Sequence, residues 1–282
     1  MKERLDFDVF RSSFRYTLLQ TFRQLNAGWF LGLQVIGPIF LLLTSWTVLQ
    51  IVGSSGTSTF AALSGYADYI PFAILGFAFS GVIMNTVWAG ANGIRSEQQG
   101  GTVEAIFVTP ANKVAWMLGK IAGSITVALT STVIVLIVGS VLLSFTLSAT
   151  PDLLSAAVGV FLTLVGMTAF AFAIAGLTFL AKRVVDDINQ ILWTSLVFFT
   201  GLAFPIEALP PWAQTISWVF PITHGLTITR SAVLKGYSIF DQKLLFPVTS
   251  ILILSAIYIP LGYFSFRAFL DKARKKGALE GY

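Results

Sequence analysis

Few side chains in this sequence are of types that carry out chemistry. The chain has no cysteine and a single histidine, His224, which excludes thiol catalysis, disulfide bonds and a Cys/His metal site. No segment has the GxxxxGK(S/T) pattern of a phosphate-binding loop, so the chain is not expected to bind ATP in that way. His224 lies among proline and glycine residues, where a structural hydrogen bond is favoured over catalysis. We therefore expect no catalytic residue, and no metal or cofactor bound by this chain.

The polar side chains within the apolar part of the chain are mostly uncharged. Asn85 and Asn92 are seven residues apart, hence on one face of a helix, with Trp88 between them. Asn189 and Trp193 lie close together in a later segment. Amides in lipid form hydrogen bonds across helix contacts, so these five residues either hold helices together or line a transport pathway. No Asp, Glu, Lys or Arg falls in the middle of an apolar segment, which argues against a carrier driven by an ion gradient.

Long uncharged stretches form the elements that must position these residues. Only 11% of the 282 residues are charged, against about 25% in soluble domains. A spanning helix needs about 20 apolar residues, and most of the uncharged stretches are long enough and have no polar face. The sequence therefore predicts an all-α polytopic membrane protein, one transmembrane domain over 1–282 with six transmembrane helices. The expected spans are 29–52, 69–93, 114–145, 153–181, 188–204 and 244–266.

Two further segments are expected to lie at the membrane interface. In residues 1–28, Phe10, Phe14 and Leu18 recur at near-helical spacing beside arginines, which favours an interfacial amphipathic helix over a solvated one. Residues 205–243 are broken by prolines and contain tryptophans, which favour the interface. We expect one or two short re-entrant or interfacial helices there. Shorter connections are expected to be loops, at 53–65 and at 182–187.

The distribution of positive charge predicts the orientation. The N-terminal segment, the 95–120 connection, the 182–187 connection and the C-terminal tail hold fifteen Lys and Arg residues, whereas the other connections hold three. Because cytoplasmic loops are rich in Lys and Arg, both termini and the 95–120 connection are expected in the cytoplasm, in a multi-pass protein of the cell membrane. This bias accounts for the net charge of +5 without a nucleic-acid partner. The N-terminus has no pattern of a cleaved signal.

The 95–120 connection carries more pattern than a simple loop needs. Ser96 and Gln99 have the spacing of a capping box, and Gly100-Gly101 is expected to break the chain direction. Thr102 can then cap a short helix, which ends at Thr109-Pro110 because the residue before proline avoids helical angles. Such a short helix is unstable alone and needs a surface to pack on. Its apolar side is expected to be exposed, with Glu104 near the positive helix start; this side consists of Val103, Ile106 and Phe107.

Several motifs resemble the signature of type-2 ABC exporter permeases. They are Glu97, the Gly-Thr-x-Glu of residues 101–104, Thr109-Pro110 and Gly119-Lys120. A second group, before the last span, is similar to another signature of the family: Leu209-Pro210-x-Trp212, Pro221 and residues 230–236. The order of interfacial helix, spans, loop and outer segment also resembles that family over the whole chain.

The resemblance implies a specific role for each segment. Residues 95–113 would hold a coupling helix that docks on a separate ATPase, through Glu97, Gly101, Thr102, Val103, Glu104, Ile106, Phe107, Thr109 and Pro110. The segment 205–243 would form an outer gate, with Pro205, Pro210, Trp212, Pro221 and Arg230. Two ATPase subunits, which bind ATP and Mg, would serve a dimer of permeases, with a second copy or a paralogue.

The resemblance implies export of a drug or natural product across the lipid membrane, and the apolar, aromatic-rich interior without charges favours a lipophilic or amphipathic one. Two alternatives remain open from the sequence. One is export of a polysaccharide or a lipid-linked glycan. The other is a non-transporting immunity or scaffold protein of the membrane.

Overall fold

The computed structural model describes residues 2–24, 36–37, 39–40, 42–44, 46–47, 54–143, 150–178 and 185–275. These residues form helices joined by turns, without strands. The α-helices are α1 (Lys2–Gln24), α3 (Ser54–Ser64), α4 (Tyr69–Gln99), α5 (Val103–Val108), α6 (Lys113–Leu143), α7 (Leu153–Thr178), α8 (Val185–Phe199), α9 (Pro211–Ser217), α10 (Pro221–Lys235) and α11 (Leu245–Lys275). Two short 3-10 turns, η1 (Ile206–Ala208) and η2 (Gln242–Leu244), lie between them.

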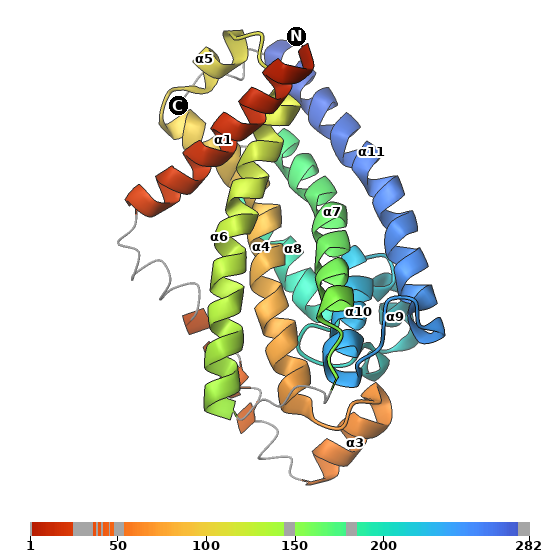
Figure 1. Cartoon of the computed structure of the whole chain (residues 1–282). Helices are drawn as coiled ribbons and strands as arrows, with labels where there is room; N and C mark the ends of the chain where they lie inside the picture. The colour runs from red at the N-terminus through yellow and green to blue at the C-terminus, as the bar shows by residue number, and fades with distance from the viewer. Residues whose placement is uncertain are drawn as a thin grey trace.

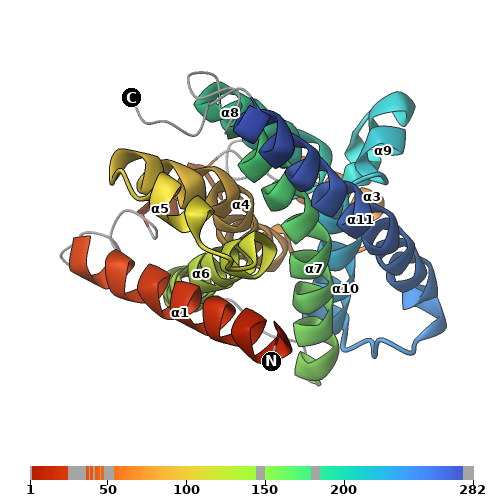
Figure 2. The ribbon, with the colours of Figure 1, turned by 90° about the horizontal axis from the view of Figure 1, so that it is seen from above.

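The long helices form a bundle around α4 and α7 (Figures 1 and 2). α7 packs along α11, α4 and α10, while α6 packs along α4 and α1. α5 and α1 lie at one end of the bundle, and α3 lies at the opposite end (Figure 1). The core is therefore built mainly between α4, α6, α7 and α11, and the polar segments lie at its two ends.

Four helices in the described part of the chain are long and apolar enough to cross a membrane. They are Tyr69–Gln99, Lys113–Val141, Leu153–Thr178 and Gln242–Lys272. These helices confirm the expected all-helical, multi-pass membrane architecture, because a crossing needs about 20 apolar residues. The expected first span, 29–52, lies mostly outside the described residues.

The expected loop at 53–65 is wrong, because Ser54–Ser64 form α3. Serine, threonine and glycine are weak helix formers, and packing overrides that preference here. The Phe60 side chain is buried and makes edge-to-face contacts with the Tyr69 and Phe72 rings, at 5.3 Å and 5.2 Å between centroids. These contacts join α3 to the start of α4.

The expected fifth span, 188–204, is also placed wrongly. α8 begins at Val185 and ends at Phe199, after 15 residues, and Gly201 then adopts a left-handed conformation with φ of 72°. Asp186 and Asp187, expected in a charged loop, lie in the first turn of α8, where the helix dipole favours negative charge. The helix is thus shorter than a full crossing and starts further toward the charged segment.

Small residues on α7 allow close helix contacts. A Cβ atom at Gly159 would approach the Ile228 side chain to 2.9 Å, and one at Gly176 would approach Phe269 to 2.9 Å. The face is therefore covered by α10 and α11 of the same chain.

Gly90 allows the closest contact between α4 and α7. A Cβ atom there would lie 2.0 Å from the Ala171 carbonyl oxygen, whereas a Cβ at Gly81 on the same helix would have no atom within 4 Å. We expect Gly90→Ala to lower the free energy of unfolding by about 1–3 kcal/mol, because overpacking forces the backbones apart. Gly81→Ala should be neutral or stabilising by up to about 1 kcal/mol. Unfolding by SDS in mixed micelles measures both, and equal effects would contradict the packing described.

Candidate functional site

The connection after α4 begins later than the sequence predicts. α4 continues through Arg95 to Gln99, so these polar residues extend the helix beyond the apolar core. The expected capping box is wrong, because Ser96 lies inside α4, where its hydroxyl donates to the Gly93 carbonyl at 3.3 Å. The break in direction is at Gly100-Gly101, as expected.

Gly101 ends α4 with a Schellman motif. Its φ is 65°, a left-handed conformation that favours glycine. The Thr102 N–H donates to the Glu97 carbonyl at 3.0 Å, and the Gly101 N–H donates to the Gln98 carbonyl at 3.2 Å. The short helix α5 therefore starts at a fixed angle to the end of α4.

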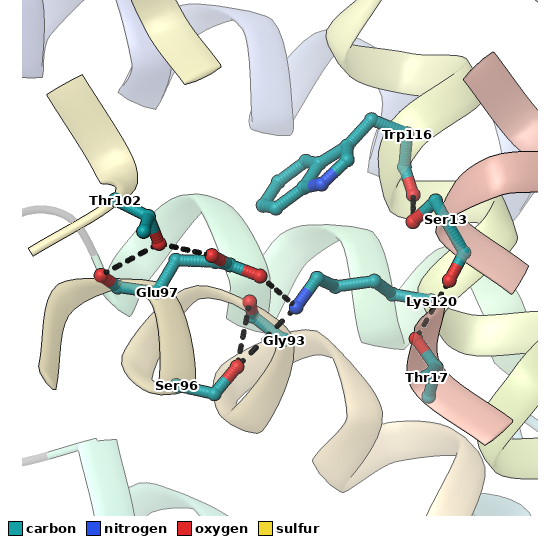
Figure 3. A network of polar contacts seen from close by, with 8 residues as sticks. All are labelled: Ser13, Thr17, Gly93, Ser96, Glu97, Thr102, Trp116 and Lys120. Carbon is teal, nitrogen blue, oxygen red and sulfur yellow. Dashed lines mark hydrogen bonds and ion pairs between the residues drawn. The ribbon is translucent and has the colours of Figure 1, made fainter. Parts of the chain in front are cut away.

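A buried ion pair connects this turn to α6 (Figure 3). The Lys120 ammonium lies 2.5 Å from the Glu97 carboxylate, and the two side chains are 3% and 6% exposed. Lys120 also donates to the Ser96 hydroxyl at 3.3 Å. Because a buried charge is stable only when paired and hydrogen-bonded, each of the two charged side chains depends on the other.

Thr102 and α1 complete the network around the ion pair. The Thr102 hydroxyl donates to the Glu97 carboxylate rather than capping α5, for which it makes no side-chain bond, so the expected cap is wrong. On the other side, the Ser13 hydroxyl of α1 donates to the Trp116 carbonyl of α6 at 2.8 Å. The network thus joins α1, the end of α4, the start of α5 and α6 (Figure 3).

The apolar side of α5 packs on its own bundle. Val103 is 3% exposed and belongs to a core cluster with Trp116 and Met117, and Ile106 packs against it. The expectation of an exposed face is therefore wrong for Val103, while Ile106 is half-buried. The outward side carries Ala105 and Val108 instead, and the Val108 side chain is 87% exposed. The side chains of Glu104 and Phe107 lie outside the described part.

Lys113 holds the other end of α5. Its ammonium donates to the Ile106 and Thr109 carbonyls, each at 2.8 Å. A cation at a helix C-terminus satisfies carbonyl groups and matches the helix dipole. Thr109 is extended, with ψ of 151°, and Pro110 follows it, so α5 ends where the sequence predicts. Both ends of this six-residue helix are therefore tied to the long helices.

An apolar groove of about 670 Å³ lies between α1, α5 and α6. Val9 and Tyr16 of α1 form one wall, and Ala105 and Ile106 of α5 form the other. Ala105, on the outward side of α5, is therefore part of the groove lining. This end of the bundle therefore offers a continuous surface made of α5 and the groove.

The expected pathway residues do not form a single hydrogen-bonded cluster. The Asn85 amide donates to the Gly81 carbonyl of its own helix at 2.8 Å, while Asn92 is exposed and lines a polar cavity of about 340 Å³. Asn189 is 4% exposed, and its carbonyl oxygen has no partner among the described residues. Trp88 and Trp193 are half-buried. α8 packs beside α4, so both helices of the prediction are neighbours.

An exposed ion pair joins α4 and α8 near that cavity. The Arg95 guanidinium lies 2.5 Å from the Asp186 carboxylate, and the side chains are 22% and 64% exposed. Exposed pairs contribute about 0–1 kcal/mol. The pair links the helices without the mutual dependence of the buried pair.

The proline-rich segment forms short helices, as its prolines suggest. Pro205 and Pro210 precede η1 and α9, and Pro221 is the first residue of α10. Trp212 is 61% exposed. The His224 Nε2–H group donates a hydrogen bond to the Trp218 carbonyl at 3.0 Å, which fits a structural role.

Arg230 connects this segment to the bundle core. Its guanidinium is buried and donates to the carbonyls of Phe72, Gly201 and Leu202 at 3.1, 2.7 and 2.8 Å. It also lies 3.3 Å from the centroid of the Phe72 ring. α10 is thereby tied to α4 and to the turn after α8.

Sequence reasoning missed three contacts of this kind: the Lys120 partner of Glu97, the Lys113 cap of α5 and the carbonyl ligands of Arg230. A usable signal existed for the first, because Lys120 is a lone charge at the start of a long apolar run. The other two contacts are to backbone carbonyls, which every residue has, so residue types do not point to them.

Comparison with known proteins agrees with this architecture. The profile of a family described as ABC-2 family transporter protein matches residues 51–264. Two curated proteins, named "Probable multidrug ABC transporter permease YbhR" in Escherichia coli K12 and in Escherichia coli O157:H7, are 24% identical to the chain over 147 residues. The match covers 52% of this chain and 39% of each relative, so it spans less than half the length of these relatives. The chain therefore belongs to the ABC-2 family of transporter proteins and is a multi-pass membrane permease rather than an enzyme.

Proposed function

We propose that the chain is the membrane subunit of an ATP-driven exporter, and that a separate ATPase subunit drives it through α5. The observation that carries this proposal is the attachment of α5. This helix is too short to be stable alone, yet both its ends are held, by the Thr102–Glu97 contact and by Lys113. A force applied to its outward side would reach α4 and α6 directly.

The outward side of α5 suits contact with a partner. Val108 is 87% exposed, and the residue after it, Thr109, lines the groove between α1 and α5. Burial of apolar surface favours association with a docked partner. We assign this surface to the ATPase, which supplies the ATP and Mg sites that this chain is not expected to contain.

The proposed topology has six spans with both termini in the cytoplasm. The residues around 29–52 supply the first span, and α8 supplies a short fifth one. The outer segment with α9 and α10 then enters the membrane from the far side and returns, as an outer gate. The positive charges of the α5 end support this orientation.

The permease is proposed to work as a dimer, with a second copy or a paralogue. Asn85, Trp88 and Asn92 follow the least buried stripe of α4, whose other faces are covered. A second permease on that stripe would place the amides beside the pathway. The uncharged, aromatic lining favours a lipophilic or amphipathic substrate, a drug or natural product, which agrees with the printed name of the multidrug relatives.

The coupling role predicts a large effect at Val108. We expect Val108→Glu to abolish stimulation of the ATPase by the permease, because a buried carboxylate at the contact would be unpaired. The ATPase is first identified by purification with the permease from native membranes, and both are then reconstituted in vesicles. ATP hydrolysis and outward substrate movement are measured together.

Phe240→Glu is the matched control, because Phe240 is 88% exposed and lies at the other end of the bundle. It should leave ATPase stimulation unchanged. Normal coupling in Val108→Glu would reject the docking surface. Transport driven by an ion gradient without any ATPase would reject the proposed function itself.

A further inference from the structure

A polar cavity lies at the end of the bundle opposite α5. It measures about 270 Å³ and is enclosed by the α3–α4 connection, the turn before η1, α10 and the segment that leads to α11. Three cationic side chains and one acidic side chain line it: Arg230, Lys235, Lys243 and Glu207. The lining thus carries an excess of two positive charges, in a chain where charges are rare.

Arg230 contributes a positive charge that no acid neutralises. Its contacts are three backbone carbonyls and the Phe72 ring, and no carboxylate of the described residues lies within 4.0 Å of it. Three of its five N–H groups are used in this way. Carbonyl dipoles solvate a guanidinium in part, but they do not cancel its charge, so its field extends into the cavity.

Lys235 and Lys243 face the same cavity from two other segments. The Lys235 ammonium lies over the Tyr66 ring, 4.0 Å from its centroid, and the Lys243 ammonium donates to the Tyr237 hydroxyl at 2.8 Å. Neither forms an ion pair within the described part of the chain. Burial is the main cause that lowers the pKa of Lys235, and repulsion from Lys243 acts in the same direction.

Neutral donors complete the cavity wall. The Tyr66 and Ser231 hydroxyls share a hydrogen bond at 3.1 Å, and each hydroxyl can also bond to a ligand. Glu207 is exposed and stands as the one acid in the lining. Cations with hydroxyl donors around a small cavity match an oxyanion, because hydrogen bonds between ionised groups are the strongest that side chains offer.

We propose that this cavity binds a phosphate compound of net negative charge, either a lipid with an anionic headgroup or a soluble phosphate. The bound oxyanion would be held by Lys235 and Lys243, with the Arg230 charge behind them and the hydroxyls at its sides. Binding would relieve the repulsion between the cations. This site is separate from the α5 surface and needs no ATPase, so its test is independent of the proposed function.

The experiment measures binding to the purified full chain in neutral detergent, by the shift of its thermal unfolding midpoint. The probes are inorganic phosphate, dihexanoylphosphatidylglycerol and, as a net-neutral control, dihexanoylphosphatidylcholine. A ligand that binds only the folded protein raises the midpoint with concentration, which yields a Kd. Lys235→Gln and Lys243→Gln should each raise that Kd about tenfold, as loss of a charge-assisted hydrogen bond predicts. Glu207→Gln should lower it, because the lining loses its negative charge.

Lys272→Gln is the matched control, since Lys272 is an exposed lysine on α11 outside the cavity. Its Kd should equal that of the unchanged protein. Phosphatidylglycerol binding without inorganic phosphate binding would assign the site to a lipid headgroup, and similar binding of both would assign it to a soluble phosphate. The proposal is overturned if no probe raises the midpoint, if phosphatidylcholine does so equally, or if the three lysine variants behave alike.

Discussion

Replacing Glu97 by glutamine is expected to lower the free energy of unfolding by about 3–5 kcal/mol, the cost of leaving a buried charge without its partner. The side chain of Lys120 is 3% exposed, and its ammonium would keep the Ser96 hydroxyl and an amide oxygen as hydrogen-bond partners, without an opposite charge. Lys120→Met should cost about as much for the opposite reason, because the Glu97 carboxylate is then unpaired. Unfolding by SDS in mixed micelles, followed by circular dichroism, measures these changes.

The double variant distinguishes the role of the ion pair in stability from its role in coupling to the ATPase. Glu97→Gln combined with Lys120→Met leaves no buried charge, and replacement of a whole buried pair by neutral groups is often close to neutral. We expect it to recover most of the lost stability. If the ion pair also transmits movement from α5 to α6, the double variant will still show reduced ATPase stimulation. Recovery of both stability and stimulation would restrict the pair to a structural role.

Asp186→Asn is the matched control for this series. It removes the carboxylate of α8 that pairs with Arg95 of α4, a side chain that is 64% exposed. The free energy of unfolding should fall by no more than about 1 kcal/mol. Equal losses of stability from Asp186→Asn and Glu97→Gln would show that burial does not determine how much each ion pair contributes to the free energy of unfolding.

Much of the fold was predictable from charge alone. Each long charge-free stretch that the structure describes contains a helix, because lipid requires that backbone groups be satisfied within a helix. α5 was also predictable, since the Gly100-Gly101 and Thr109-Pro110 signals are local and act through backbone angles. These features depend on residues close together in the sequence.

The helix ends were harder to predict. Arg95 to Gln99 are polar, and polarity suggested a loop, yet a helix keeps its backbone bonds in water as well as in lipid. Ser54–Ser64 show the reverse case, in which weak helix formers are held helical by the aromatic contacts of Phe60. In both cases the end of the helix is determined by backbone hydrogen bonds or side-chain contacts within the protein, and not by burial in lipid.

The candidate site depends on long-range partners, which explains what the sequence could not indicate. Glu97 and Lys120 are 23 residues apart, so no helical spacing rule relates them. Val103 and Ile106 have the pattern of an apolar face, and the pattern does not specify whether a partner or the same chain covers it. The sequence therefore identified the residues of the candidate site, whereas the contacts around them become visible only from the packing of α1, α5 and α6.

Arg230→Met is the second change for which a large loss of stability is expected. The side chain is 4% exposed and holds three carbonyls that belong to α4 and to the turn after α8. Methionine fills a similar volume but donates nothing, so the Gly201 and Leu202 carbonyls lose this donor, and the Phe72 carbonyl loses the bond it accepts in addition to its helix bond. Each unsatisfied buried group costs about 1–3 kcal/mol, and we expect a total loss of at least about 3 kcal/mol.

Arg230→Lys tests whether the charge or the shape of the group matters. An ammonium keeps the charge, yet it lacks the planar fork that reaches carbonyls in different directions. We therefore expect Arg230→Lys to recover only part of the stability lost in Arg230→Met. Full recovery would mean that the positive charge alone ties α10 to the core.

Arg267→Met provides the matched control, because Arg267 is exposed on α11 and its contact is with the Tyr263 ring, at 5.0 Å. Its loss should change the unfolding midpoint little, since exposed cation–π contacts contribute about 0.5–1 kcal/mol. The Arg230 variants should in addition unfold first around α10, because α4 and the turn at Gly201 lose their common anchor there. Hydrogen exchange resolved by segment measures this order, and uniform loss of protection along the chain would contradict a local anchoring role for Arg230.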